Sequence, residues 1–161
     1  LKTKIMKAVT LFITSVVFFL GCNCKKATSM TNYSTTETME TLQELPKLIY
    51  DSHTRGFYKL ITIENGKISV LTTREGQPIT KVLSASELEE LKSIVNKLDL
   101  NKIPTLEAPT EKRFYDGAPI TNLEVIKANQ SYKTTDFDGG FPPAYIEELV
   151  NKILEIADKV E

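Results

Sequence analysis

The dipeptide Asn65-Gly66 constrains the fold of this chain more than any other feature of its sequence. It separates two runs, 57–64 and 67–73, that are rich in β-branched and aromatic residues. Asn-Gly is the favoured two-residue type I′ turn, because both central positions of that turn need positive φ. The stretch from 57 to 73 therefore predicts a β-hairpin.

Further strands are indicated on both sides of this hairpin. Short strands are predicted at 48–50 and at 79–83, the latter after a turn-like Gly-Gln-Pro sequence. A second hairpin is predicted from the runs 120–127 and 131–137, with its turn around Asn129-Gln130. The predicted strands thus form two groups, one in each half of the folded region.

One helix is predicted after each group of strands. Ser84 and Glu87 have the spacing of a capping box, so the first helix begins there, and it ends near 98–100. Pro142-Pro143 favours the start of the second helix. Each helix has apolar residues on one face at intervals of three and four. The order predicts an α+β class, with an antiparallel sheet built from two β-hairpins and two helices packed on one face.

The N-terminal region has a different character. Lys2, Lys4 and Lys7 precede a mostly apolar run, 8–20, whose thirteen residues fall short of the roughly 20 needed to span a bilayer. Its length and flanks are typical of a signal peptide. The run ends Phe19-Leu20-Gly21-Cys22, which resembles the bacterial lipobox. That resemblance implies a signal peptide at 1–21 and diacylglycerol on the Cys22 thiol, with cleavage before Cys22.

This resemblance implies a protein anchored in a membrane of the bacterial cell envelope, with inner and outer membrane both left open. Other interpretations of Cys22 and Cys24 fit less well. A metal pair needs further ligands, and the single histidine, His53, is distant in sequence. A disulfide between residues two apart is strained. Cys24 is then a spare thiol of unassigned role, and translation from Leu1 or from Met6 both remain open.

Residues 22–44 form a segment rich in Ser and Thr without periodic apolar residues, which predicts a flexible tether after the lipidated cysteine. Residues 45–161 predict a single small α+β domain. Removing 1–21 takes away three of the 20 basic side chains and none of the 21 acidic ones, so the net charge becomes about −4. This charge and the lack of a basic cluster argue against nucleic acid as a partner.

The loop from Arg113 to Pro119 is the most distinctive candidate site. Its arginine and its two aromatic residues, Phe114 and Tyr115, are of the types that anchor protein interfaces, and Asp116 begins an Asp-Gly turn. A structural alternative stays open: the aromatic residues cover the sheet edge while Arg113 pairs with an acid such as Asp138. A binding loop of Arg113, Phe114, Tyr115, Asp116 and Asp138 is thus one of two hypotheses.

Catalytic and metal sites are less well indicated. Asp51, Ser52 and His53 alternate in direction along an extended backbone, so they do not converge as a triad. Residues 136–140 resemble the start of an EF-hand calcium loop, but the following Phe-Pro-Pro interrupts the ligand pattern. No metal, cofactor or catalytic residue is therefore predicted.

Residues 55–154 resemble emfourin-type metallopeptidase inhibitors. The resemblance rests on Arg55-Gly56-Phe57, the LSASELEELKSIV helix, LNKIPTL, and LEVIKANQSYKTTDF before a proline-led helix. The family's usual Gly-Gly-Phe is Arg-Gly-Phe here, and no inhibitory residue is transferred. The segments EKRFYDGAP and FDGGFPP are similar to uncharacterised lipoproteins of flavobacteria.

Together these features predict a membrane-anchored envelope lipoprotein with a non-catalytic binding or inhibitor-like domain. An envelope protein is the expected partner, besides the membrane that holds the lipid. Two alternatives remain: a structural or accessory envelope component without a discrete ligand, and an enzyme of unrecognised type.

Overall fold

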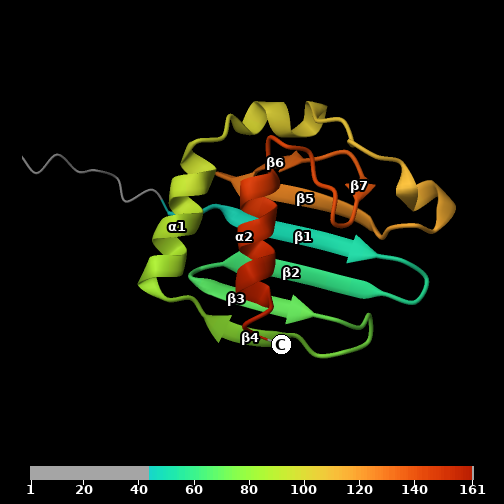
Figure 1. The fold of residues 1–161 in the computed structure, drawn as a ribbon. Helices are drawn as coiled ribbons and strands as arrows, with labels where there is room; N and C mark the ends of the chain where they lie inside the picture. The colour runs from blue at the N-terminus through green and yellow to red at the C-terminus, as the bar shows by residue number, and fades with distance from the viewer. Residues whose placement is uncertain (1–43, 161) are drawn as a thin grey trace, which may run out of the picture. The chain divides into compact units, whose positions relative to one another are not determined.

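The computed structural model describes residues 44–160, so the expectations for 1–43, including Cys22, lie outside the described residues. The described region is one antiparallel sheet with two α-helices on the same face, which confirms the predicted α+β class (Figure 1). The elements in order are β1 (Lys47–His53), β2 (Tyr58–Glu64), β3 (Lys67–Leu71), β4 (Ile79–Val82), α1 (Ala85–Asn96), the 3-10 helices η1 (Leu100–Thr105) and η2 (Lys112–Tyr115), β5 (Ile120–Lys127), β6 (Gln130–Lys133), β7 (Phe137–Asp138) and α2 (Glu147–Ala157).

The strand order is β4-β3-β2-β1-β5-β6, and β7 pairs with the start of β5. The strand expected at 48–50 is in fact β1, which has seven residues and lies between the two hairpins. Its residues pair on both sides, as Leu48 does with Ile63 of β2 and Val125 of β5. Leu48, Tyr50 and Ser52 are buried and their neighbours are not, as expected for a strand with one covered face.

The hairpin around Asn65-Gly66 is confirmed. β2 and β3 pair up to Glu64 and Lys67, and the turn residues have φ of 51° and 71°. Positive φ at both positions is the type I′ requirement that the sequence signalled.

The second hairpin differs from its prediction. Its turn is Ala128-Asn129, with φ of 50° and 63°, one residue earlier than expected. The returning strand β6 ends at Lys133, because the Thr134 hydroxyl accepts the Leu123 amide and so takes the place of a backbone carbonyl. Phe137 belongs instead to the separate strand β7.

The end of α1 and the start of α2 differ from their predictions. Helix α1 begins with the predicted capping box, in which Ser84 accepts from the Glu87 amide and Glu87 accepts from the Ser84 amide. It ends at Asn96, slightly before the expected 98–100. Helix α2 begins at Glu147 rather than at Pro142-Pro143, because a turn closed by Ile146 N–H and Pro143 O intervenes.

The core lies between the sheet and the two helices. Its fully buried side chains include Ile61, Leu91, Leu123, Phe137 and Ile153, which come from every part of the described region. Buried polar groups are paired: Ser52 Oγ and Thr121 Oγ1 are 2.8 Å apart, and no side-chain nitrogen or oxygen buried within residues 44–160 lacks a hydrogen bond. Neither α-helix of this region has the length and hydrophobicity to cross a bilayer.

Candidate functional site: an arginine-lined pocket at one end of the sheet

Three loops meet at one end of the sheet, which we call the loop end. They are the β1–β2 turn (54–57), the β3–β4 loop (72–78) and the segment 110–119 before β5, all at the right of Figure 1. The strand register places them together, since His53 pairs with both Tyr58 and Ile120. The described polypeptide enters β1 at the opposite end of the sheet.

Asp138 organises the longest of these loops. Its carboxylate is fully buried, and it accepts hydrogen bonds from the Thr110 hydroxyl, the Lys112 amide (2.6 Å) and the Arg113 amide (2.9 Å). Arg113 Nη1 adds an ion pair at 3.0 Å and also donates to the Thr110 carbonyl. The two amides begin η2, whose own N-cap residue Glu111 forms no capping bond. Asp138 therefore caps η2 from a distant strand.

The ionisation of Asp138 follows from these contacts. Burial favours the neutral acid, but the hydrogen bonds from Thr110, Arg113 and Lys112 outweigh it and hold the pKa of Asp138 at about 2. The carboxylate is thus charged at any ordinary pH, and its charge is already paired with Arg113 within the fold. The predicted pairing of Arg113 with Asp138 is confirmed, and Asp138 is not exposed as a binding residue.

A pocket of about 460 Å³ lies between the three loops. Its lining residues are His53, Thr54, Arg55, Arg74, Arg113, Asp116, Ala118 and Ile120. The sequence has 20 basic side chains but only three arginines, and all three line this pocket together with the single histidine. Every other basic residue is a lysine. This concentration of arginine is the main chemical feature of the domain.

The three guanidinium groups are held differently. Arg113 is fixed by Asp138, and its guanidinium lies 4.3 Å from the Phe114 ring centroid. Arg74 stacks on the Tyr58 ring at 4.8 Å. Arg55 is exposed, and within residues 44–160 its side chain has no ion pair or hydrogen bond. The N–H groups of Arg113 are therefore engaged within the fold, whereas those of Arg55 and Arg74 are available to a ligand.

Exposed aromatic side chains lie beside the pocket. Phe114 is 65% exposed and Tyr115 is 81% exposed, so these rings do not cover the sheet edge as the structural alternative required. Asp116 follows with φ of 55°. Phe57, from the β1–β2 turn, is also exposed. The structure therefore places the predicted Phe114, Tyr115 and Asp116 on the surface of the loop end.

The weaker candidates do not form sites. Ser52 faces the core, whereas His53 Nδ1 lies 3.2 Å from Asp51 Oδ1 on the other face of the sheet, so the three residues do not converge. Asp136 contacts Asn122 at 3.4 Å, and Asp138 is enclosed by its own donors. Residues 44–160 contain no group of three side chains placed to hold a metal ion.

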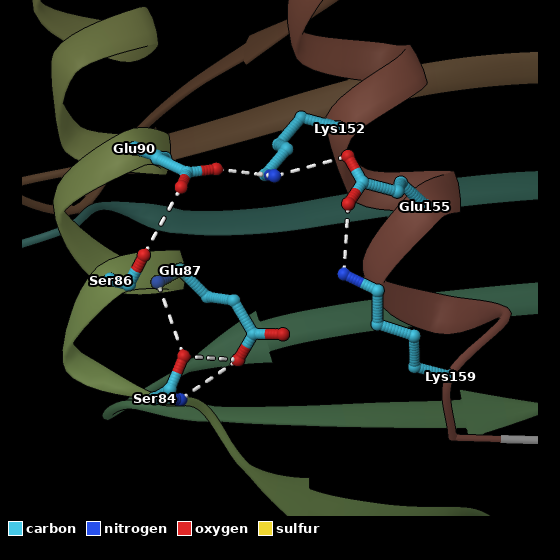
Figure 2. Close-up of polar contacts among 7 residues, drawn as sticks. All are labelled: Ser84, Ser86, Glu87, Glu90, Lys152, Glu155 and Lys159. Atoms are coloured by element: carbon cyan, nitrogen blue, oxygen red, sulfur yellow. Dashed lines mark hydrogen bonds and ion pairs between the residues drawn. The ribbon is translucent and has the colours of Figure 1, made fainter.

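A larger hollow of about 640 Å³ lies between α1 and α2, but its charges satisfy one another. Figure 2 shows Lys152 of α2 between Glu90 and Glu155, and Lys159 in contact with Glu155 at 2.8 Å. These contacts lower the pKa of Glu90 and Glu155 and raise that of Lys152, so all of them stay ionised and paired. The loop end is the better candidate because two of its arginines make no ion pair within the described region.

The sequence analysis considered His53 and Arg55 in other roles and did not single out Arg74, so it assigned none of the three to a binding pocket. A signal was present: in an antiparallel sheet the loops after alternate strands share one end, and the rare arginines occur in such loops. Using that signal required knowing that β1 lies between the two hairpins, because this strand order brings the three loops to the same end of the sheet. Comparison with protein-family models, curated proteins and solved structures finds no match.

Proposed function

We propose that this chain is a lipid-anchored protein of the bacterial cell envelope whose domain binds an acidic partner protein, without catalysis, through the loop end. The single observation that carries the binding role is the convergence of all three arginines on one pocket flanked by exposed Phe114 and Tyr115. Arginine and tyrosine are enriched among the residues that dominate binding energies at protein interfaces. The proposal includes inhibitor-like binding, in which the partner is an enzyme.

The loop end is held in shape before any partner arrives. Asp138 fixes the start of η2, and Lys112 Nζ lies 3.5 Å from the Phe141 ring centroid. The β1–β2 turn is closed by the Thr54 hydroxyl, which accepts the Gly56 and Phe57 amides at 3.2 and 3.0 Å. Binding by prearranged loops loses less conformational entropy, so more of the contact energy appears as affinity.

The direction of β1 places the attachment point of the proposed tether and the loop end at opposite ends of the sheet. Residues 22–43 join the domain at the start of β1, and the loop end begins after its seventh residue, about 20 Å further at about 3.3 Å per residue. An anchor on Cys22 therefore connects to the end of the sheet opposite the arginine pocket. The proposed tether is therefore attached away from the loop end and does not block access of a protein partner to it.

Partner capture with matched variants tests the proposal. The full-length protein is cross-linked on intact cells, with Phe114→Ala and Tyr115→Ala compared with Val82→Ala. Val82 is an exposed apolar residue at the far end of β4, so it controls for the loss of a surface apolar side chain. We expect each loop variant to lose at least about tenfold of the cross-linked partner, as for a residue that contributes more than about 1 kcal/mol, and Val82→Ala to retain it.

Two outcomes contradict the proposal. Equal capture by all variants shows that the loop end does not bind the partner. Absence of any partner of the wild-type protein, together with an envelope defect on deletion, favours the structural role instead.

A further inference from the structure

We propose that the arginine-lined pocket is a carboxylate subsite, in which Arg55 and Arg74 hold one carboxylate of the partner while Arg113 positions the loop. This inference rests on the proposed function and specifies the chemical group that the loop end recognises. The carboxylate belongs either to an acidic side group or to the C-terminus of a polypeptide, and the experiment below separates these sources.

The charges around the pocket favour a ligand group that carries a single negative charge. Arg113 is neutralised by the buried Asp138, and His53 Nδ1 lies in hydrogen-bond contact with Asp51 Oδ1 at 3.2 Å. Of the charged residues that line the pocket, this leaves Arg55 and Arg74 against Asp116, the one acidic lining residue. The remaining net charge of about one positive unit matches a carboxylate better than a doubly charged phosphate.

The donors also suit a carboxylate. Each guanidinium has five N–H groups in a planar fork that matches two carboxylate oxygens. Neither Arg55 nor Arg74 uses these groups on an acid within residues 44–160. The contact with the Tyr58 ring, 4.8 Å from the Arg74 guanidinium to the ring centroid, limits the directions that this guanidinium can adopt. Arg74, which is held against Tyr58, and the exposed Arg55 thus line the same pocket.

The pocket has room for more than the charged group. Its volume of about 460 Å³ is within the range of small-ligand sites, roughly 300–1,000 Å³. Ala118 and Ile120 supply an apolar wall on which the methylene groups of a glutamate or the last residue of a polypeptide can pack. Asp116 opposes the bound charge, so it limits affinity for isolated anions and favours ligands that also contact the neighbouring aromatic residues.

Because the chain has only three arginines, binding of a carboxylate by Arg55 and Arg74 can be tested by NMR. Arginine-selective 15N labelling of the full-length protein in a zwitterionic detergent gives one Nε–Hε signal for each arginine, assigned with Arg55→Gln, Arg74→Gln and Arg113→Gln. The probes are N-acetylglutamate α-amide, its glutamine counterpart, N-acetylglycine and inorganic phosphate. We expect saturable shifts at Arg55 and Arg74 with millimolar N-acetylglutamate α-amide, and little change at Arg113 or with the glutamine compound.

Variants identify the ligating residues. Arg55→Gln and Arg74→Gln should each weaken N-acetylglutamate α-amide binding about tenfold, the effect of losing a charge-assisted hydrogen bond. Lys67→Gln, which removes a basic group at the other end of the sheet, should change it less than about twofold. Asp116→Asn should strengthen binding, because it removes the acid that opposes the ligand.

The outcomes separate the possible ligands. A stronger response to N-acetylglycine than to the glutamate amide identifies a polypeptide C-terminus as the source of the carboxylate. A stronger response to phosphate overturns the carboxylate assignment, as does no shift at Arg55 and Arg74 or an equal response to the glutamine compound. If cross-linking still depends on Tyr115 in that case, the carboxylate inference is wrong and the proposed function stands.

Discussion

At the scale of single residues, Asp138 determines the shape of the loop end. It joins β7 to the start of η2 through two side chains and two backbone amides, all within reach of one buried carboxylate. All of these donors share one acceptor, so removing the carboxylate charge affects them together. The largely buried Arg113 guanidinium then loses its ion pair.

Asp138→Asn should therefore be strongly destabilising. The amide keeps the shape of the carboxylate but presents an NH₂ group to a cluster of donors, so we expect a loss of about 2–4 kcal/mol in the free energy of unfolding. Urea denaturation measures this loss. Asp136→Asn is the matched control, because the exposed Asp136 makes one long contact with Asn122 at 3.4 Å. A loss for Asp138→Asn no larger than for the control would show that the cluster does not stabilise the fold.

The same carboxylate gives a pH dependence of defined sign. Its pKa is lowered from 3.8 to about 2 in the folded protein, so the unfolded state takes up the proton first as pH falls. The stability difference between wild type and Asp138→Asn should be constant above about pH 5, shrink between pH 3.8 and about 2, and disappear below that. A difference that does not change down to about pH 2 would contradict the assignment of the charge to Asp138.

At the scale of elements, local signals were readable from the sequence and pairings between distant segments were not. The Asn65-Gly66 turn and the Ser84 capping box depend on neighbours within a few residues, and both are present. The central place of β1 depends on pairing with β5, where Ser52 and Thr121 are 69 residues apart. The end of β6 depends on one hydroxyl, that of Thr134, which no periodic pattern reveals.

The capping box predicts a measurable contribution of Ser84 to stability. Its hydroxyl accepts the Glu87 amide at 3.3 Å and also donates to the Glu87 carboxylate at 2.8 Å (Figure 2). Ser84→Ala should lower the free energy of unfolding by about 1 kcal/mol. Ser86→Ala is the control, since its hydroxyl donates to the exposed Glu90 carboxylate, and it should change stability by less than about 0.5 kcal/mol. Equal effects in urea denaturation would argue against the cap.

At the scale of the whole molecule, the candidate site required knowledge of the complete sheet. The sequence identified Arg113 and its aromatic neighbours because they are contiguous. Arg55 and Arg74 lie in two other loops that carry no motif, and only the strand order brings them to the same pocket. The proposed anchor, in contrast, rests on a short contiguous sequence that resembles a lipobox and lies outside the described residues.

The anchor is tested by comparing the two cysteines. In the proposed protein Cys22 carries the acyl groups, and each buried methylene contributes about 0.8 kcal/mol to membrane binding. Cys22→Ala should move the protein from the membrane to the soluble fraction or leave the signal peptide uncleaved, whereas Cys24→Ala should remain membrane-bound. Mass spectrometry of the purified protein detects the modification. An unmodified Cys22 thiol with residues 1–21 still attached would contradict the anchor.

The central claim, that the loop end is the binding surface, is tested most directly by photo-crosslinking in intact cells. A benzophenone group is placed at Tyr115, and in a second protein at Val82 near the opposite end of the sheet. The proposal predicts one discrete adduct from position 115, lost when Arg55 and Arg74 are both replaced by glutamine, and no such adduct from position 82. The same adduct from both positions, or from position 82 alone, would contradict it.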